Sequence, residues 1–253
     1  MSTFIASTIN NNYYHRGRLG NLFFVGFALH FISLKNNLYV RYQDHDKFIR
    51  LGIDWFVGEN IYENTISLSD SNFFDLINGE AKEINVSIVN NVWCQTKEFS
   101  QYLMKYMNEE PQKSKVINNN IFRNRFNNNN DVYVHIRLGD VTNSFAHPLS
   151  YYDSALSKIK FNNGYISSDS ISNDICQKLI EKYHLNVINY DEITTIMFAT
   201  TCKYLVLSSG TYSWLIGLIA YYSAEIYYPK IYKKWHGDIF VFPEWHEVDY
   251  DNT

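Results

Sequence analysis

Residues 133–140 read YVHIRLGD, and this stretch indicates which kind of fold the chain adopts. Its alternating apolar residues predict a buried strand. Because side chains alternate along a strand, His135 and Arg137 would share one face, with Arg137 near the carboxyl end. Gly139 permits a sharp turn onto Asp140. A buried guanidinium needs an anionic partner, so we expect either a pair with Asp140 or a phosphate ligand.

Strands and helices alternate along the chain after this point. Strands are predicted at residues 132–138, 163–169, 186–190, 203–209 and 225–229, and helices between them at 150–159, 172–184, 191–202 and 211–223. Such alternation is typical of parallel strands joined by right-handed crossovers. The fold class predicted for this region is therefore α/β, with a parallel sheet.

The chain before this region has a different pattern. A glycine-containing turn at 17–21 precedes a mostly apolar helix at 22–35 and a strand at 36–42, and a further helix at 96–110 ends before Pro111.

A run of asparagines marks the predicted boundary between the two regions. Residues 124–131 read NRFNNNND, a composition that disfavours both regular states and is typical of an exposed loop. We therefore expect an N-terminal lobe at 1–126, a Rossmann-like lobe at 127–229 and a C-terminal tail at 230–253 that packs back on the fold.

Composition excludes several classes of protein. The formal net charge of −4 argues against a general nucleic-acid binder. The three cysteines lack metal-ligand spacing and cannot all pair, which predicts reduced thiols in the cytoplasm. Residues 1–21 do not read as a signal peptide, and the most apolar later stretch, 214–228, is too short and polar to be a transmembrane segment of about 20 residues.

Polar groups follow three of the predicted strands, where ligands bind in parallel α/β sheets. Beside the His135 and Arg137 element, the SSD of residues 167–169 could meet a ribose or base edge, or could cap the next helix. The stretch SSGTYSW, residues 208–214, opens a helix and could hold an anion, or could supply ordinary caps. Asp44 and Asp46 could hold a divalent cation, although short acidic triplets are common in loops.

Taken in order, these motifs resemble those of the α-1,2-fucosyltransferase family, glycosyltransferase family 11, and more distantly those of the α-1,6- and protein O-fucosyltransferases. The similar elements are Gly17-Arg18-Leu19-Gly20-Asn21, the His135-x-Arg137-x-x-Asp140 element, the strand end Ser168-Asp169, and residues 208–215, which read SSGTYSWL. The resemblance extends over roughly residues 17–229.

The resemblance implies a GT-B-like fold, in which two Rossmann-like lobes with parallel sheets face a cleft. It implies an inverting, metal-independent transfer of L-fucose from GDP-fucose to a glycan hydroxyl, with an α-1,2 linkage expected. The implied partners are a nucleotide sugar and a glycan acceptor, with no cofactor beyond the donor substrate. Because Golgi relatives carry a membrane anchor, we expect a bacterial or viral enzyme acting in the cytoplasm.

The resemblance also implies roles for individual residues. Arg137 would hold the donor pyrophosphate and stabilise the departing GDP, His135 would support that site, and Asp140 is the first candidate for the general base. The implied donor-binding residues are Arg18, Gly20, Asn21, Ser168, Asp169, Ser209, Gly210, Thr211 and Ser213.

Departures from the family pattern leave alternatives open. The glutamine that usually follows Gly-Asn is Leu22 here, and the usual second arginine is Leu138. The donor could therefore be another GDP-deoxyhexose or UDP-rhamnose. A non-catalytic module that binds a sugar nucleotide or a glycan also remains open, as does a metal-dependent transferase that uses Asp44 and Asp46.

Overall fold

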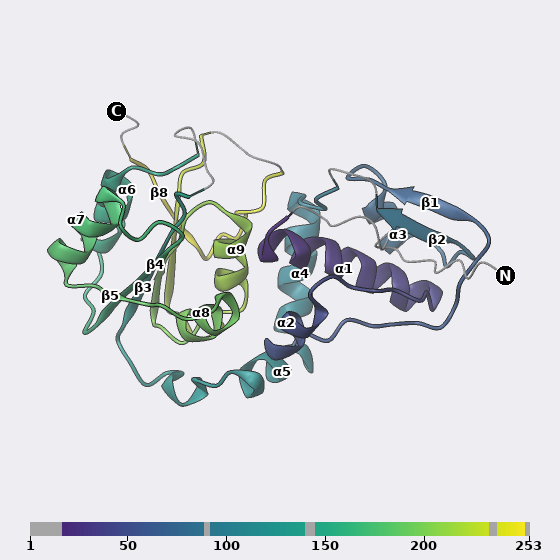
Figure 1. Cartoon of the computed structure of the whole chain (residues 1–253), viewed down its shortest axis with the longest axis horizontal. Coiled ribbons are helices and arrows are strands. Elements are labelled where there is room, and N and C mark those ends of the chain that lie inside the picture. Colours follow the sequence, from purple (N-terminus) through teal and green to yellow (C-terminus); the bar gives the residue numbers. More distant parts are fainter. Residues whose placement is uncertain (1–16, 89–91, 140–144, 233–236, 251–253) are drawn as a thin grey trace.

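The structure is a computed structural model that describes residues 17–88, 92–139, 145–232 and 237–250. Figure 1 shows two parts side by side. The sheet part, residues 132–250, contains a parallel sheet with helices on both faces. The N-terminal part, residues 17–125, is mostly helical.

The sheet part has six parallel strands in the order β5-β4-β3-β6-β7-β8. The strands are β3 (Val132–Ile136), β4 (Gly164–Ser168), β5 (Asn186–Val187), β6 (Tyr204–Val206), β7 (Glu225–Pro229) and β8 (His246–Val248). The α/β class and the parallel sheet predicted from the sequence are therefore confirmed. The C-terminal tail contributes β8, which pairs with β7 at one edge.

Helices cover both faces of this sheet. They are α6 (Leu149–Leu156), α7 (Asp174–Tyr183), α8 (Glu192–Ala199) and α9 (Thr211–Leu218). All five residues of β3 are buried, and alternate side chains enter different cores. Val132, Val134 and Ile136 pack with α6 and α7, whereas Tyr133 packs in the core that contains α8 and α9. His135 and Arg137 are on the same side of the strand as Tyr133, facing the N-terminal part.

The N-terminal part contains a two-stranded parallel sheet among its described residues. Its strands are β1 (Thr65–Leu68) and β2 (Asn85–Ile88). The predicted strand at 36–42 instead forms an isolated bridge between Leu38 and Asn60. The helical elements are α1 (Leu19–Asn36), α2 (His45–Arg50), α3 (Phe73–Asn78), α4 (Lys97–Asn108), α5 (Gln112–Asn119) and the 3-10 turn η1 (Arg123–Arg125).

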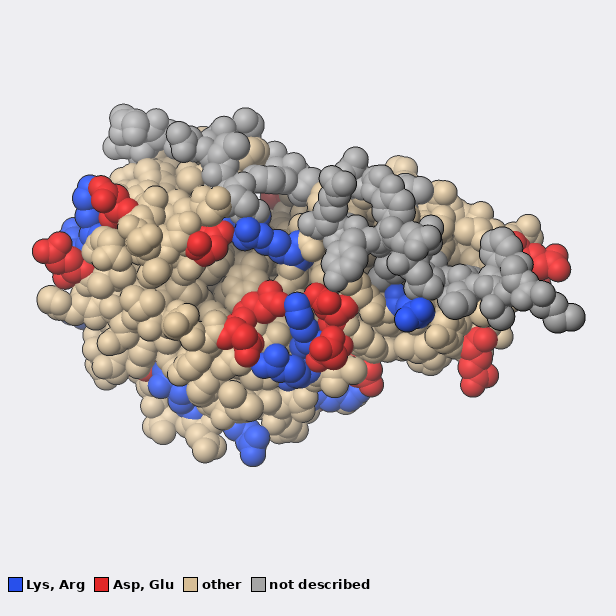
Figure 2. Space-filling view, in the orientation of Figure 1, with Lys and Arg blue, Asp and Glu red and all other residues tan. Residues whose placement is uncertain are grey.

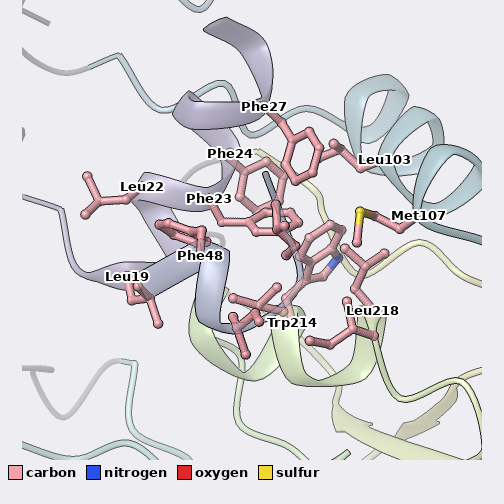
Figure 3. Close-up of a cluster of buried hydrophobic side chains, with 14 of the residues drawn as sticks. Leu19, Leu22, Phe23, Phe24, Phe27, Phe48, Leu103, Met107, Trp214 and Leu218 are labelled. Atoms are coloured by element: carbon pink, nitrogen blue, oxygen red, sulfur yellow. The ribbon is translucent and has the colours of Figure 1, made fainter. Parts of the chain in front are cut away.

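A single hydrophobic core joins the two parts through α1 and α9 (Figure 3). The ring centroids of Phe24 and Trp214 are 4.5 Å apart, and those of Phe23 and Trp214 are 6.0 Å apart. The Trp214 indole N–H donates to the carbonyl of Ile239 in the tail. This shared core fixes the first turn of α1 beside the first turn of α9, at the carboxyl edge of the sheet.

None of the helices in the described ranges combines the length and the apolar character that crossing a bilayer requires.

Candidate functional site

A cavity of about 700 Å³ opens at the carboxyl edge of the sheet, between the two parts. Figure 2 shows a hollow in this region, with acidic and basic side chains gathered at its rim. The sheet part contributes His135, Arg137, Ser167, Ser168, Asp169, Ile188, Asn189, Tyr190, Glu192, Thr195, Thr211 and Tyr212. The N-terminal part contributes Gly17, Arg18, Leu19, Leu22, Gln43, Asp44 and Lys47.

His135 lies at the bottom of this cavity as a buried, neutral imidazole. Its Nδ1 is 2.5 Å from the hydroxyl of Ser213, which also accepts the backbone N–H of Ser208 at 3.2 Å. Burial lowers the pKa of His135 to about 4. The negative charge of Asp169 raises this pKa, whereas the positive charges of Arg137 and Arg18 lower it. At neutral pH the ring is therefore a hydrogen-bonding group without a charge.

The Arg137 guanidinium lies against the start of α9. A Cβ atom added to Gly210, the N-cap residue of that helix, would lie 3.0 Å from Arg137 Nη1. The first N–H groups of a helix have no intrahelical acceptor, and the helix dipole favours negative charge there. A guanidinium beside a helix start is therefore suited to a phosphate or diphosphate. The predicted base, Asp140, lies outside the described residues.

Asp169 organises the loop that carries Arg137. Its Oδ1 accepts the backbone N–H groups of Leu138 at 2.8 Å and Gly139 at 2.9 Å, and its Oδ2 accepts from Arg18 Nη1 at 3.0 Å. Partial burial opposes ionisation, but these hydrogen bonds outweigh it and lower the pKa of Asp169. The carboxylate thus ties the turn after β3 to the residue before α1.

Gly20 and Asn21 join the two parts at the edge of the cavity. A Cβ atom on Gly20 would lie 2.4 Å from the carbonyl carbon of Thr211, so the close approach of α1 to α9 requires glycine. Asn21 Oδ1 accepts from Gln95 Nε2 and from the Thr211 hydroxyl, both at 2.9 Å. These two residues hold the walls together and are not among the lining residues.

The remaining predicted residues divide between the cavity and its support. Ser168 lines the cavity, and its hydroxyl accepts the backbone N–H of Ser170 at 3.1 Å. Ser213 is fully buried and holds His135. Ser209 lies 2.7 Å from His147 Nε2 and is not a lining residue.

Sequence reasoning identified neither Lys47 of α2 nor Glu192 of α8 as a residue of the cavity. Lys47 Nζ lies 2.9 Å from Asp44 Oδ2 and 2.7 Å from Glu192 Oε1 of α8. The hydrogen bond to Glu192 has the largest effect on the pKa of Lys47, and the one to Asp44 the next largest; both raise it above its ordinary value. Burial lowers this pKa, but by less. Asp46 is exposed on α2 and does not line the cavity. In the described part of the chain, no group of three or more His, Cys, Asp or Glu residues is placed to hold a metal ion.

The chain matches no protein-family model, and a search of curated proteins gives no match.

Proposed function

We propose that this chain is a glycosyltransferase that binds a nucleotide sugar in the cavity at the carboxyl edge of its sheet. One observation supports this proposal most directly: a single cavity brings together Arg18, Arg137, the neutral His135 and the start of α9. A volume of about 700 Å³ suits a ligand of this size. In open parallel sheets, this edge is the usual place for ligands.

The proposed reaction is the inverting transfer of L-fucose from GDP-fucose to a glycan hydroxyl, without a metal ion. When the sugar leaves its diphosphate, negative charge grows on the phosphate oxygen. Arg137 and the amides at the start of α9 would stabilise that charge, which is the role a metal ion has in other transferases. Another GDP-deoxyhexose or UDP-rhamnose is the alternative donor.

The two parts of the molecule would divide the substrates between them. The sheet part carries Arg137, His135 and α9 and would hold the donor. The N-terminal part would form the acceptor side of a GT-B-like cleft, with its two-stranded sheet as a reduced second lobe. The α-1,2 linkage follows from the family resemblance of the sequence.

The experiment is a transfer assay with the purified chain, GDP-fucose and a panel of glycan acceptors, measuring release of GDP. We expect turnover that persists in excess chelator and falls at least about 100-fold in Arg137→Ala. The control is Arg123→Ala, because Arg123 is exposed on η1 and lies outside the cavity.

Normal turnover of Arg137→Ala would contradict the proposed role of this cavity. Binding of the nucleotide sugar without turnover on any acceptor would support the non-catalytic module instead.

A further inference from the structure

Three carboxylates stand among the described lining residues of the cavity: Asp44, Asp169 and Glu192. An inverting transfer needs a group that accepts the proton of the acceptor hydroxyl. The surroundings of the three carboxylates differ enough to distinguish their roles.

Asp169 already has a structural role on both of its oxygens. Oδ1 holds the turn after β3 through two backbone N–H groups, and Oδ2 pairs with Arg18. A proton on this carboxylate would weaken the contacts that aim Arg137. Asp169 also belongs to the sheet part, beside the turn that carries Arg137, the residue that would bind the diphosphate.

Asp44 has no comparable structural role. It occupies the N-cap position of α2, where an aspartate side chain normally accepts an N–H of the first turn, yet it makes no capping hydrogen bond. Its backbone is left-handed, with φ 53° and ψ 30°, a conformation that aspartate adopts more readily than most residues other than glycine. The side chain lines the cavity and pairs with Lys47 at 2.9 Å.

Asp44 and Glu192 pair with the same Lys47 ammonium, at 2.9 Å and 2.7 Å, but they come from different parts of the molecule. Glu192 is the first residue of α8, in the sheet part that also carries Arg137 and α9. Asp44 comes from the N-terminal part, which the proposed function assigns to the acceptor, and its ion pair with Lys47 lies beside α8. In an inverting displacement the acceptor oxygen attacks from the side opposite the leaving diphosphate, so its base belongs on the acceptor side of the reacting carbon.

We infer that Asp44 is the general base of the transfer reaction, an inference that rests on the proposed function. The acceptor O–H bond breaks and its proton moves to the Asp44 carboxylate while the acceptor oxygen bonds to the anomeric carbon. The bond from that carbon to the phosphate oxygen breaks, and its electron pair leaves with the nucleoside diphosphate. Lys47 is a positioning residue that holds the Asp44 carboxylate.

The test compares Asp44→Asn with Asp46→Asn, which makes the same change two residues further along on an exposed side chain. We expect Asp44→Asn to lower kcat at least about 100-fold and to leave the affinity for GDP, measured by calorimetry, within about twofold. Asp46→Asn should keep wild-type turnover. In Asp44→Ala, added formate should restore part of the lost rate, which a purely structural role would not allow.

The possible outcomes separate this inference from the proposed function. If the wild-type chain transfers fucose and Asp44→Asn keeps its rate, Asp44 is not the base and the proposed function stands. A loss of turnover in Glu192→Gln but not in Asp44→Asn would assign the base to Glu192. If the wild-type chain neither binds GDP nor transfers a sugar, both proposals fail.

Discussion

Acid should destabilise this fold through three buried histidines, His30, His135 and His147. Burial lowers the pKa of each to about 4. For His30 the hydrogen bonding also requires a neutral ring, because the Phe56 N–H donates to His30 Nδ1 at 2.8 Å and that nitrogen must be an acceptor. In the unfolded chain each side chain would regain its ordinary pKa of 6.5.

The sign and size of the effect follow from these pKa values. Between about pH 6.5 and pH 4 the unfolded chain binds more protons than the folded chain, so the free energy of unfolding falls as the pH falls. Each histidine contributes a slope that approaches about 1.4 kcal/mol per pH unit. At pH 5 each histidine has lowered the free energy of unfolding by about 2 kcal/mol relative to neutral pH. This is a large share of the 5–15 kcal/mol by which a typical domain is stable.

The assay is urea unfolding of the wild-type chain and of His147→Gln at pH 7.5, 6.5, 5.5 and 5.0. His147 is suited to the substitution because it does not line the cavity. We expect the variant to lose the share of the slope that His147 contributes, which approaches about 1.4 kcal/mol per pH unit. A wild-type stability that stays flat between pH 7.5 and 5.0 would refute this reasoning.

Two further substitutions test the packing that positions the cavity. Gly20→Ala should lower the free energy of unfolding by about 1–3 kcal/mol and weaken GDP binding, because the added methyl group would meet the Thr211 backbone; a melting temperature at or above that of the wild type would argue against this contact. Arg125→Ala should lower the free energy of unfolding by about 2–3 kcal/mol, because it removes the cation 2.8 Å from the carboxylate of Asp131, whose side chain is 4% exposed. If urea unfolding shows a loss no greater than that of Arg123→Ala, the ion pair contributes little to stability.

The sheet part could be predicted from the sequence because its signals are local. β3 and β4 lie inside the predicted ranges 132–138 and 163–169, and α8 and α9 begin within a residue of their predicted starts. Short apolar runs bounded by turn residues are sufficient for such assignments. The predicted strand at 36–42 failed because strand formation there depends on a partner, and the structure offers a single bridge to Asn60.

The candidate site could be predicted only in part because its contacts cross between distant segments. Arg137 and Asp169 follow strands whose carboxyl ends meet in any parallel sheet. The pairing of Lys47 with Glu192 instead depends on how α2 packs against α8, which leaves no local signal. The sequence alone does not show whether Ser213 faces a ligand or the protein interior. Its contact with His135 depends on the packing of α9 on β3.

The measurement that tests the central claim most directly is the calorimetric titration of GDP into the wild-type chain and into Arg137→Ala. We expect one GDP to bind per chain and the variant to bind at least tenfold more weakly, since a hydrogen bond to a charged group contributes about 1.5–3 kcal/mol. Arg123→Ala should bind as the wild type does. Equal affinities in the wild-type chain and Arg137→Ala, or no binding to either, would contradict the account.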